Sequence, residues 1–322
     1  MTASAPGKLM LFGEHAVLFG FPCIVTAVGQ RMRVTVELID EAEFQLDAPD
    51  VKVTGYRKKI SEIGLGEIPK GAKFVEQAVK NFIGTFGNFK GGVRIVTQSE
   101  FSSEFGFGSS SASTVCAIGA LMQLVQGRID QRALFDLAYK TVLDIQGKGS
   151  GYDIAAAIWG GTLLFQAGGK IIEPLQVHDI PLIIGYSGQK YETVKVIDEV
   201  KKLHDRFPEK IDAAYRDMGA LVPLAKNALE KSDWPRVGAL MNDNQRLLEM
   251  LEVSSPKLSA MIDAAREAGV FGAKISGSGK GDCIVALAAS GKRQAISDKI
   301  STVGGSVIDV PCNVVGLRIE SR

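Results

Sequence analysis

The chain has 322 residues, of which 46% are hydrophobic and 23% charged, and its formal net charge at pH 7 is +1. This length suits two packed domains, and the balanced charge gives no reason to expect nucleic acid or a membrane surface as a partner. Scattered cysteines and histidines argue against disulfides and metal clusters, and the lack of a signal peptide or a membrane-length apolar run predicts a cytoplasmic protein.

Strands and helices are both predicted in the first half of the chain. Short apolar or alternating runs predict strands at residues 8–12, 31–38, 93–97 and 162–165. Helical spacing of apolar residues predicts helices at residues 74–86, 110–126, 131–146 and 154–158. This half is therefore expected to be of the α+β class.

The pattern of residues changes between Pro174 and Pro181, so we predict a domain boundary there and two domains, residues 1–175 and 176–322. Strands are expected in the second at residues 182–186, 273–276, 283–288 and 314–319. Long amphipathic stretches predict helices at residues 191–207, 209–231, 235–251 and 256–268. The second domain is thus also predicted to be α+β.

The most informative segment is glycine- and serine-rich and reads Gly106-Phe107-Gly108-Ser109-Ser110-Ser111-Ala112-Ser113. A helix that begins here offers unpaired N–H groups and the positive end of its dipole to phosphate oxygens. The segment is neither a Walker A loop nor a good Rossmann fingerprint. A serine-rich N-cap on a core helix would have the same composition, so this segment alone does not decide between the two.

Two further glycine-rich segments extend the pattern. They read Ala5-Pro6-Gly7-Lys8-Leu9-Met10-Leu11-Phe12-Gly13-Glu14-His15-Ala16-Val17 and Gly272-Ala273-Lys274-Ile275-Ser276-Gly277-Ser278-Gly279-Lys280-Gly281-Asp282-Cys283. In this order the three segments resemble the three motifs of the GHMP kinases. The resemblance implies the α+β GHMP kinase fold, with a ribosomal-protein-like N-terminal domain, a ferredoxin-like C-terminal domain and an active site between them.

The resemblance also implies ATP and Mg²⁺ as cofactors of a small-molecule kinase. The ATP-binding residues would be Gly106, Gly108, Ser109, Ser110, Ser111 and Ser113, and Ser110 would also coordinate Mg²⁺. An N-cap role stays open for Ser109 or Ser111.

Two residues are implied to be catalytic. Lys8 would stabilise charge near the acceptor hydroxyl, although a solvated lysine at the start of a strand is the alternative. Asp153 matches the family's catalytic aspartate at the start of a helix, where it would accept or orient the proton of the acceptor hydroxyl. A first-turn aspartate favoured by the helix dipole is its structural alternative.

Several segments are most similar to mevalonate kinases: the Gly13-Glu14-His15-Ala16-Val17 run, the helix around residues 240–254 and the loop before Thr193. By this resemblance Glu14, His15 and Thr193 bind or approach mevalonate, and Gly277 and Ser278 line the site. The implied reaction is phosphorylation of the 5-hydroxyl of mevalonate in isoprenoid biosynthesis. A homodimer is also implied.

Three departures keep the acceptor open. Val142 stands where these kinases carry a magnesium-binding glutamate, and Asp144 should face away because two residues rotate a helix by about 200°. The segments around residues 146–153 and 281–283 look more like phosphomevalonate kinases. Finally, Ser102-Ser103-Glu104-Phe105 replaces a usual proline–glycine pair.

Lys148 becomes a candidate because of these departures, since it would meet the acceptor carboxylate or a second phosphate. A solvated turn lysine is its alternative. Two other functions therefore stay open: a kinase acting on a phosphorylated mevalonate, and a catalytically silent relative that senses a nucleotide or a sugar-like ligand.

Overall fold

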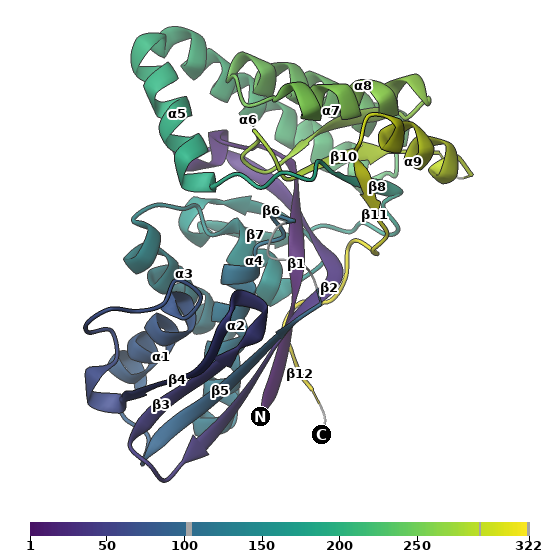
Figure 1. Ribbon diagram of the computed structural model, residues 1–322. Helices are drawn as coiled ribbons and strands as arrows, with labels where there is room; N and C mark the ends of the chain where they lie inside the picture. Colours follow the sequence, from purple (N-terminus) through teal and green to yellow (C-terminus); the bar gives the residue numbers. More distant parts are fainter. Residues whose placement is uncertain (101–104, 290, 321–322) are drawn as a thin grey trace.

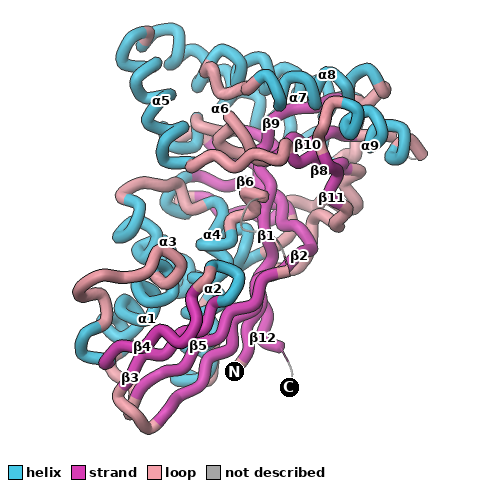
Figure 2. The backbone as a smooth tube through the Cα atoms, viewed as in Figure 1, coloured by secondary structure: helices cyan, strands magenta, loops and turns pink. Residues whose placement is uncertain are grey.

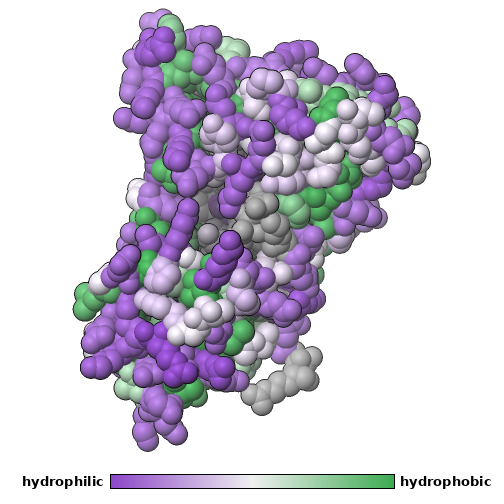
Figure 3. Space-filling model, in the orientation of Figure 1, coloured by the Kyte–Doolittle hydropathy of each residue, from purple (hydrophilic) through white to green (hydrophobic). Residues whose placement is uncertain are grey.

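The computed structural model describes residues 1–100, 105–289 and 291–320, and it arranges them in two halves that each contain one sheet (Figure 1). Ser102, Ser103 and Glu104, which depart from the proline–glycine pattern, lie outside the described residues. The face shown in Figure 3 is mostly hydrophilic and narrows between the two halves. Among the described residues, no helix is both long and apolar enough to cross a membrane.

The first sheet has eight strands, with the order β12-β1-β2-β5-β3-β4 and with β6 joining β2 to β7. The strands are β1 (Thr2–Phe12), β2 (Pro22–Ile39), β3 (Glu43–Ala48), β4 (Val53–Lys59), β5 (Gly92–Ser99), β6 (Thr162–Gln166), β7 (Ile171–Pro174) and β12 (Arg318–Glu320). Only the β3–β5 pair is parallel among the pairings of this sheet in the described residues.

Four helices cover one face of this sheet (Figure 2). They are α1 (Lys73–Phe86), α2 (Ser109–Gln126), α3 (Gln131–Gln146) and α4 (Tyr152–Trp159). The side chains of β5 alternate accordingly: Val93 and Ile95 are buried toward the helices, whereas Arg94 and Val96, the residues that follow each of them, are exposed on the other face. Helix α2 is buried along most of its length and forms the centre of this core.

The second sheet has the order β11-β8-β10-β9, and its pairs are antiparallel. Its strands are β8 (Leu182–Tyr186), β9 (Gly272–Ser276), β10 (Cys283–Leu287) and β11 (Ser306–Ile308). The helices of this half are α5 (Thr193–Arg206), α6 (Pro208–Glu230), α7 (Trp234–Met250), α8 (Pro256–Glu267) and α9 (Arg293–Thr302). Every residue of β8, β9 and β10 is buried, as the largely apolar sequences of β8 and β10 require, and β9 buries Lys274 and Ser276 as well.

The connection between β1 and β2 carries the first motif into the second half. Phe19 stacks on Tyr215 of α6 with ring centroids 4.3 Å apart, and Ala16 belongs to the core of the second half. In Figure 1 this purple segment reaches the helices of the upper half. The two halves therefore share a boundary at which His15 and its neighbours lie.

The predicted helices are confirmed within a few residues, and so are the strands predicted at residues 93–97, 162–165, 182–186, 273–276 and 283–288. The strands predicted at residues 8–12 and 31–38 are only the ends of longer strands, because β1 begins at Thr2 and β2 at Pro22. The strand predicted at residues 314–319 is wrong over most of its length, because only Arg318–Glu320 is a strand and Val315 makes an isolated bridge to Gly160. The backbones approach closely at this bridge, since a Cβ on Gly160 would lie 2.1 Å from the Gly316 nitrogen. The domain boundary at residues 175/176 stays a prediction, although β12 returns to the first sheet.

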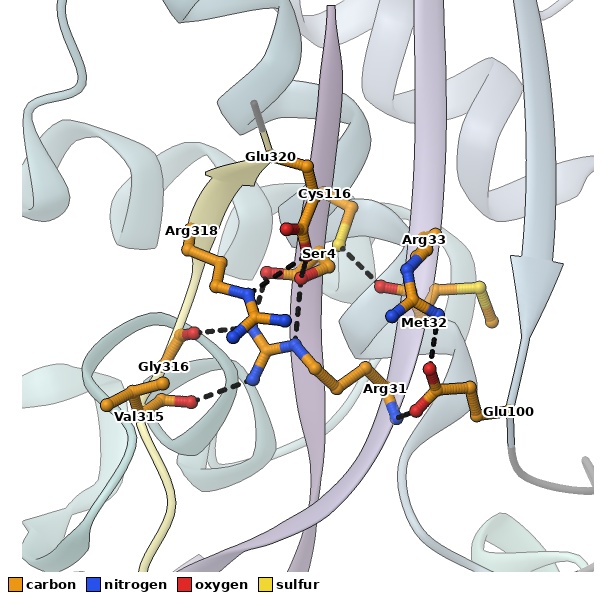
Figure 4. A network of polar contacts seen from close by, with 10 residues as sticks. All are labelled: Ser4, Arg31, Met32, Arg33, Glu100, Cys116, Val315, Gly316, Arg318 and Glu320. Atoms are coloured by element: carbon orange, nitrogen blue, oxygen red, sulfur yellow. Dashed lines mark hydrogen bonds and ion pairs between the residues drawn. The ribbon is translucent and has the colours of Figure 1, made fainter. Parts of the chain in front are cut away.

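A buried arginine fastens this returning segment (Figure 4). Arg31 on β2 is only 5% exposed. Its guanidinium donates to the carbonyls of Val315 at 3.0 Å and Gly316 at 2.7 Å, and to the side chain and carbonyl of Ser4, both at 2.8 Å. The side chain thus links β1, β2 and the segment that leads into β12.

We expect Arg31→Ala to lower the free energy of unfolding by about 3 kcal/mol, because the buried carbonyls of Ser4 and Gly316 and the partly buried carbonyl of Val315 lose a charged donor. The matched control is Arg33→Ala on the same strand, whose pair with Glu100 is about one-third exposed and should cost no more than about 1 kcal/mol. Urea unfolding followed by circular dichroism measures both. Equal losses in the two variants would contradict this role of Arg31.

Candidate active site

The cradle at residues 106–113 lies at the start of α2 and against β1. Gly108 is the N-cap of α2 and has φ of 83°, a conformation that favours glycine, and it brings no side chain to occupy the first-turn N–H groups. Phe107 packs on β1 so closely that a Cβ on Gly7 would lie 3.0 Å from the Phe107 Cβ. The backbone N–H of Lys8 donates to the carbonyl of Phe107 at 3.0 Å. The first two motifs are therefore in direct contact.

Lys8 and Asp153 meet at this point. A Cβ on Gly108 would lie 3.3 Å from the Cε of Lys8 and 3.5 Å from the Cβ of Asp153. Lys8 is 8% exposed, so it is not a solvated residue at a strand start. Its Nζ donates to the carbonyl of Gly106 at 2.9 Å and lies 5.4 Å from the centroid of the Tyr152 ring.

Asp153 is held from the other side by the cradle helix. It lies in the first turn of α4, and its Oδ2 accepts a hydrogen bond of 3.4 Å from the hydroxyl of Ser111. Ser111 is therefore not an N-cap, and Ser109 begins the helix after the Gly108 cap. The N-cap alternative for both serines is thus wrong.

The predicted acceptor residues line one cavity, which we name the Asp153 pocket. From the sequence prediction it includes Glu14, His15, Ser111, Lys148, Asp153, Thr193, Gly277 and Ser278. Ser150 lines it too, and the hydroxyls of Ser150 and Ser278 are buried without a hydrogen-bond partner among the described residues. Buried hydroxyls are normally satisfied, so these two suit a polar ligand in the pocket.

A second cavity opens on the other side of the cradle, and we name it the Ser110 pocket. Ser109, Ser110 and Ser113 line it together with Lys190. The hydroxyl of Ser113 donates to the carbonyl of Ser110 at 3.0 Å, so that donor is used within the helix. The cradle therefore separates two cavities and has serines facing both of them.

Glu14 takes part in a buried network that reaches the third motif. Its Oε1 forms an ion pair with the Nζ of Lys274 on β9, and its Oε2 accepts a hydrogen bond of 3.1 Å from Asn244 of α7. Lys274 is fully buried, and burial lowers its pKa against the opposing effect of the Glu14 charge. Both carboxylate oxygens of Glu14 thus have protein partners, although the residue lines the pocket. The sequence pattern around Lys274 does not predict this partner.

His15 is oriented by the backbone of the third motif. Its Nε2 lies 2.9 Å from the carbonyl of Ser278, and because a carbonyl only accepts, this nitrogen carries the proton and Nδ1 is left as an acceptor. Burial lowers the pKa of His15 below its ordinary value. The imidazole is therefore neutral at neutral pH.

This lowered pKa gives a pH dependence of stability. Below pH of about 6.5 the unfolded chain takes up the His15 proton and the folded protein does not, so acidification favours unfolding by at most about 1.4 kcal/mol per pH unit. The contribution is complete above that pH and is lost as the pH falls toward the folded-state pKa. We expect His15→Gln to show a smaller loss of unfolding free energy between about pH 7.5 and about pH 5.5 than the unchanged protein.

The control for this experiment is His178→Gln, since His178 is exposed. It should keep the pH dependence of the unchanged protein. The same dependence in all three proteins would rule out His15 as its source.

The position at which related kinases carry a magnesium-binding glutamate has no carboxylate here, and Asp144 faces away as predicted. Val142 lines the Asp153 pocket, whereas Asp144 turns away and accepts from Lys140 and from Asn81 at 2.9 Å. Asp282, for which the sequence predicts no role, lies against the cradle: a Cβ on Gly106 would be 2.6 Å from its Oδ2. Burial raises the pKa of Asp282 against the opposing charge of Lys8, and its Oδ1 has no hydrogen-bond partner among the described residues.

Comparisons with known proteins agree with this arrangement. Residues 73–161 match the GHMP kinases N terminal domain, and residues 225–305 match the GHMP kinases C terminal family. The chain is 33% identical to a mevalonate kinase of Pyrococcus furiosus, with 99% of this chain and 98% of that protein covered. A mevalonate kinase of Thermococcus sibiricus is 34% identical with the same coverage.

Among solved structures, the Methanococcus jannaschii mevalonate kinase superposes with a TM-score of 0.82 at 24% identity, covering 98% of both chains. This likeness shows the fold, and the full-length sequence identities show the family. The chain therefore belongs to the mevalonate kinase family of the GHMP kinases and is an ATP-dependent small-molecule kinase.

Proposed function

We propose that this kinase transfers the γ-phosphoryl group of Mg·ATP to the 5-hydroxyl of mevalonate, forming 5-phosphomevalonate for isoprenoid biosynthesis. The observation that carries the proposal is the meeting of Lys8 on β1 and Asp153 on α4 beside Gly108 of the cradle. The Asp153 pocket begins at this point and brings together the residues that resemble mevalonate kinases.

The nucleotide phosphates would bind at the start of α2. The uncapped N–H groups of its first turn and the helix dipole favour anions. Lys190, which lines the Ser110 pocket, adds positive charge on that side. The triphosphate of ATP would therefore lie between the Ser110 pocket and the Asp153 pocket.

The side chains near the cradle fit a magnesium ion that binds together with the nucleotide. Among the described residues no three histidine, cysteine or carboxylate side chains gather as a metal site, and Mg²⁺ in phosphoryl-transfer enzymes is held largely by phosphates, water and one or two protein oxygens. Ser110 would hold it. When bound, the ion neutralises charge on the transferred group.

Asp153 and Lys8 act on the acceptor hydroxyl. Asp153 accepts the proton of this hydroxyl or orients it for in-line attack, and the Ser111 hydrogen bond fixes the carboxylate in place. Lys8 is held by the carbonyl of Gly106 and places its charge where negative charge develops in the transition state. The Nδ1 of His15 can accept a hydrogen bond from a hydroxyl of the substrate.

Coupled ADP release by the purified protein tests this function, with mevalonate, 5-phosphomevalonate or no acceptor, and phosphorus NMR assigns the phosphorylated oxygen. We expect turnover with mevalonate at its 5-hydroxyl. Preference for 5-phosphomevalonate would reassign the enzyme, and nucleotide binding without turnover of either compound would support a sensor. The homodimer and the cytoplasmic location stay predictions.

A further inference from the structure

An ion pair joins the two halves at the edge of the Asp153 pocket. The Nζ of Lys148, in the loop between α3 and α4, contacts the Oδ1 of Asp198 on α5. The side chains are 32% and 53% exposed. Ion pairs in such positions contribute little to stability because water competes for both charges, so another anion can displace the carboxylate.

Lys148 has a distinct place among the charged groups of the pocket. The lining residues with ionisable side chains, within the described part of the chain, are Glu14, His15, Lys148, Tyr152 and Asp153, and burial raises the pKa of the Tyr152 phenol so that it stays neutral. Glu14 is neutralised by Lys274, and burial keeps His15 uncharged. Lys148 is therefore the only cation that lines this part of the described cavity.

Helix α5 places its partner beside the same space. Thr193, Val194 and Ile197 of α5 line the pocket, and Asp198 follows Ile197 directly. An acceptor that enters between α5 and the α3–α4 loop thus meets a lysine that already holds a carboxylate.

We propose that Lys148 binds the carboxylate of the acceptor and that Asp198 is a resident counter-ion, which the acceptor displaces. This rests on the proposed function, because it requires a carboxylate-bearing acceptor. A carboxylate that takes the place of Asp198 keeps the ammonium paired and directs the opposite end of the acceptor toward Asp153. The exchange selects acceptors with an anionic group at one end and a hydroxyl at the other.

The alternative is that the pair merely fastens α5 to the loop. The two roles predict different kinetics. A fastening pair would be weakened equally by removing either member, whereas an exchangeable counter-ion predicts opposite effects of the two substitutions on acceptor affinity.

The test is steady-state kinetics with mevalonate and with its uncharged carboxamide, at saturating Mg·ATP. We expect Lys148→Ala to raise the KM for mevalonate by about tenfold or more, the value of a charge-assisted hydrogen bond, with little change in kcat. The KM for the carboxamide should not change. Asp198→Asn should lower the KM for mevalonate, and the double variant should behave like Lys148→Ala.

Lys201→Ala is the matched control. Lys201 is also on α5, is 71% exposed and pairs with Asp205, so its removal should leave both KM values unchanged. Equal increases for the acid and the carboxamide in Lys148→Ala, or a raised KM in Asp198→Asn, would overturn the exchange.

The failure of this inference is distinguishable from failure of the function. Normal turnover of mevalonate by the unchanged protein together with an unaffected KM in Lys148→Ala refutes the exchange alone. No turnover of mevalonate by the unchanged protein refutes the proposed function and this inference with it.

Discussion

Replacing Asp153 by asparagine is expected to lower kcat by about 10²- to 10⁴-fold, the usual contribution of a positioned acid–base group. The amide keeps the size of the side chain and can still accept from Ser111, so folding should be preserved. The amide cannot accept the proton of the acceptor hydroxyl at neutral pH. Coupled ADP release at saturating ATP and mevalonate measures the change, and nucleotide affinity should stay close to that of the unchanged protein.

Asp144→Asn is the matched control, because Asp144 lies nearby in sequence but points away toward Lys140 and Asn81. Its kcat should not change. Full activity of Asp153→Asn would refute the catalytic role. The pH profile distinguishes the two possible roles of Asp153. If Asp153 accepts the proton, kcat should fall at acidic pH in the unchanged protein and this fall should be absent in the variant. If Asp153 only orients the hydroxyl, no such difference is expected.

The second large effect concerns stability. Lys274→Met should lower the free energy of unfolding by about 3–5 kcal/mol, the cost of leaving a buried charge without its partner. Here that charge is the Glu14 carboxylate, which is 1% exposed and would keep only the amide of Asn244. Urea unfolding measures the loss, provided that the dependence of the unfolding free energy on urea concentration (the m-value) is the same in both proteins.

The double variant Glu14→Gln/Lys274→Met is the control, because it removes the stranded charge as well. It should recover most of the lost stability, since a neutral pair of similar volume avoids desolvating two ions. If the double variant were as unstable as the two single substitutions added together, the ion pair would not be the source of the effect.

The glycines of the cradle and of the first motif could be predicted from local physical reasons, whereas Lys8 and Asp153 became candidates through the resemblance to GHMP kinases. Gly108 has a positive φ, Gly7 leaves room for Phe107, and Asp153 begins a helix. The orientation of Asp144 followed from helix geometry alone. Which of these residues act in the reaction still depends on the proposed experiments.

The partners of these residues could not be predicted in the same way. Lys274 lies in an apolar strand and Asp198 on an amphipathic helix, and neither carries a local sign of the residue that it meets 260 or 50 positions away. β4 was missed because most of its side chains are exposed, which removes the alternation that marks a half-buried strand. Long-range pairing decides the first two cases, and side-chain exposure decides the third.

Arg31 also constrains when the first half can finish folding. Its carbonyl partners on Val315 and Gly316 follow it by 284 and 285 positions, so a ribosome delivers them only after the whole second half has been made. Until then the edge of β1 that β12 covers is exposed in the nascent chain. The guanidinium of Arg31 also lacks two of its carbonyl acceptors during this time. The native N-terminal half is therefore completed after, and not during, synthesis of the C-terminal half.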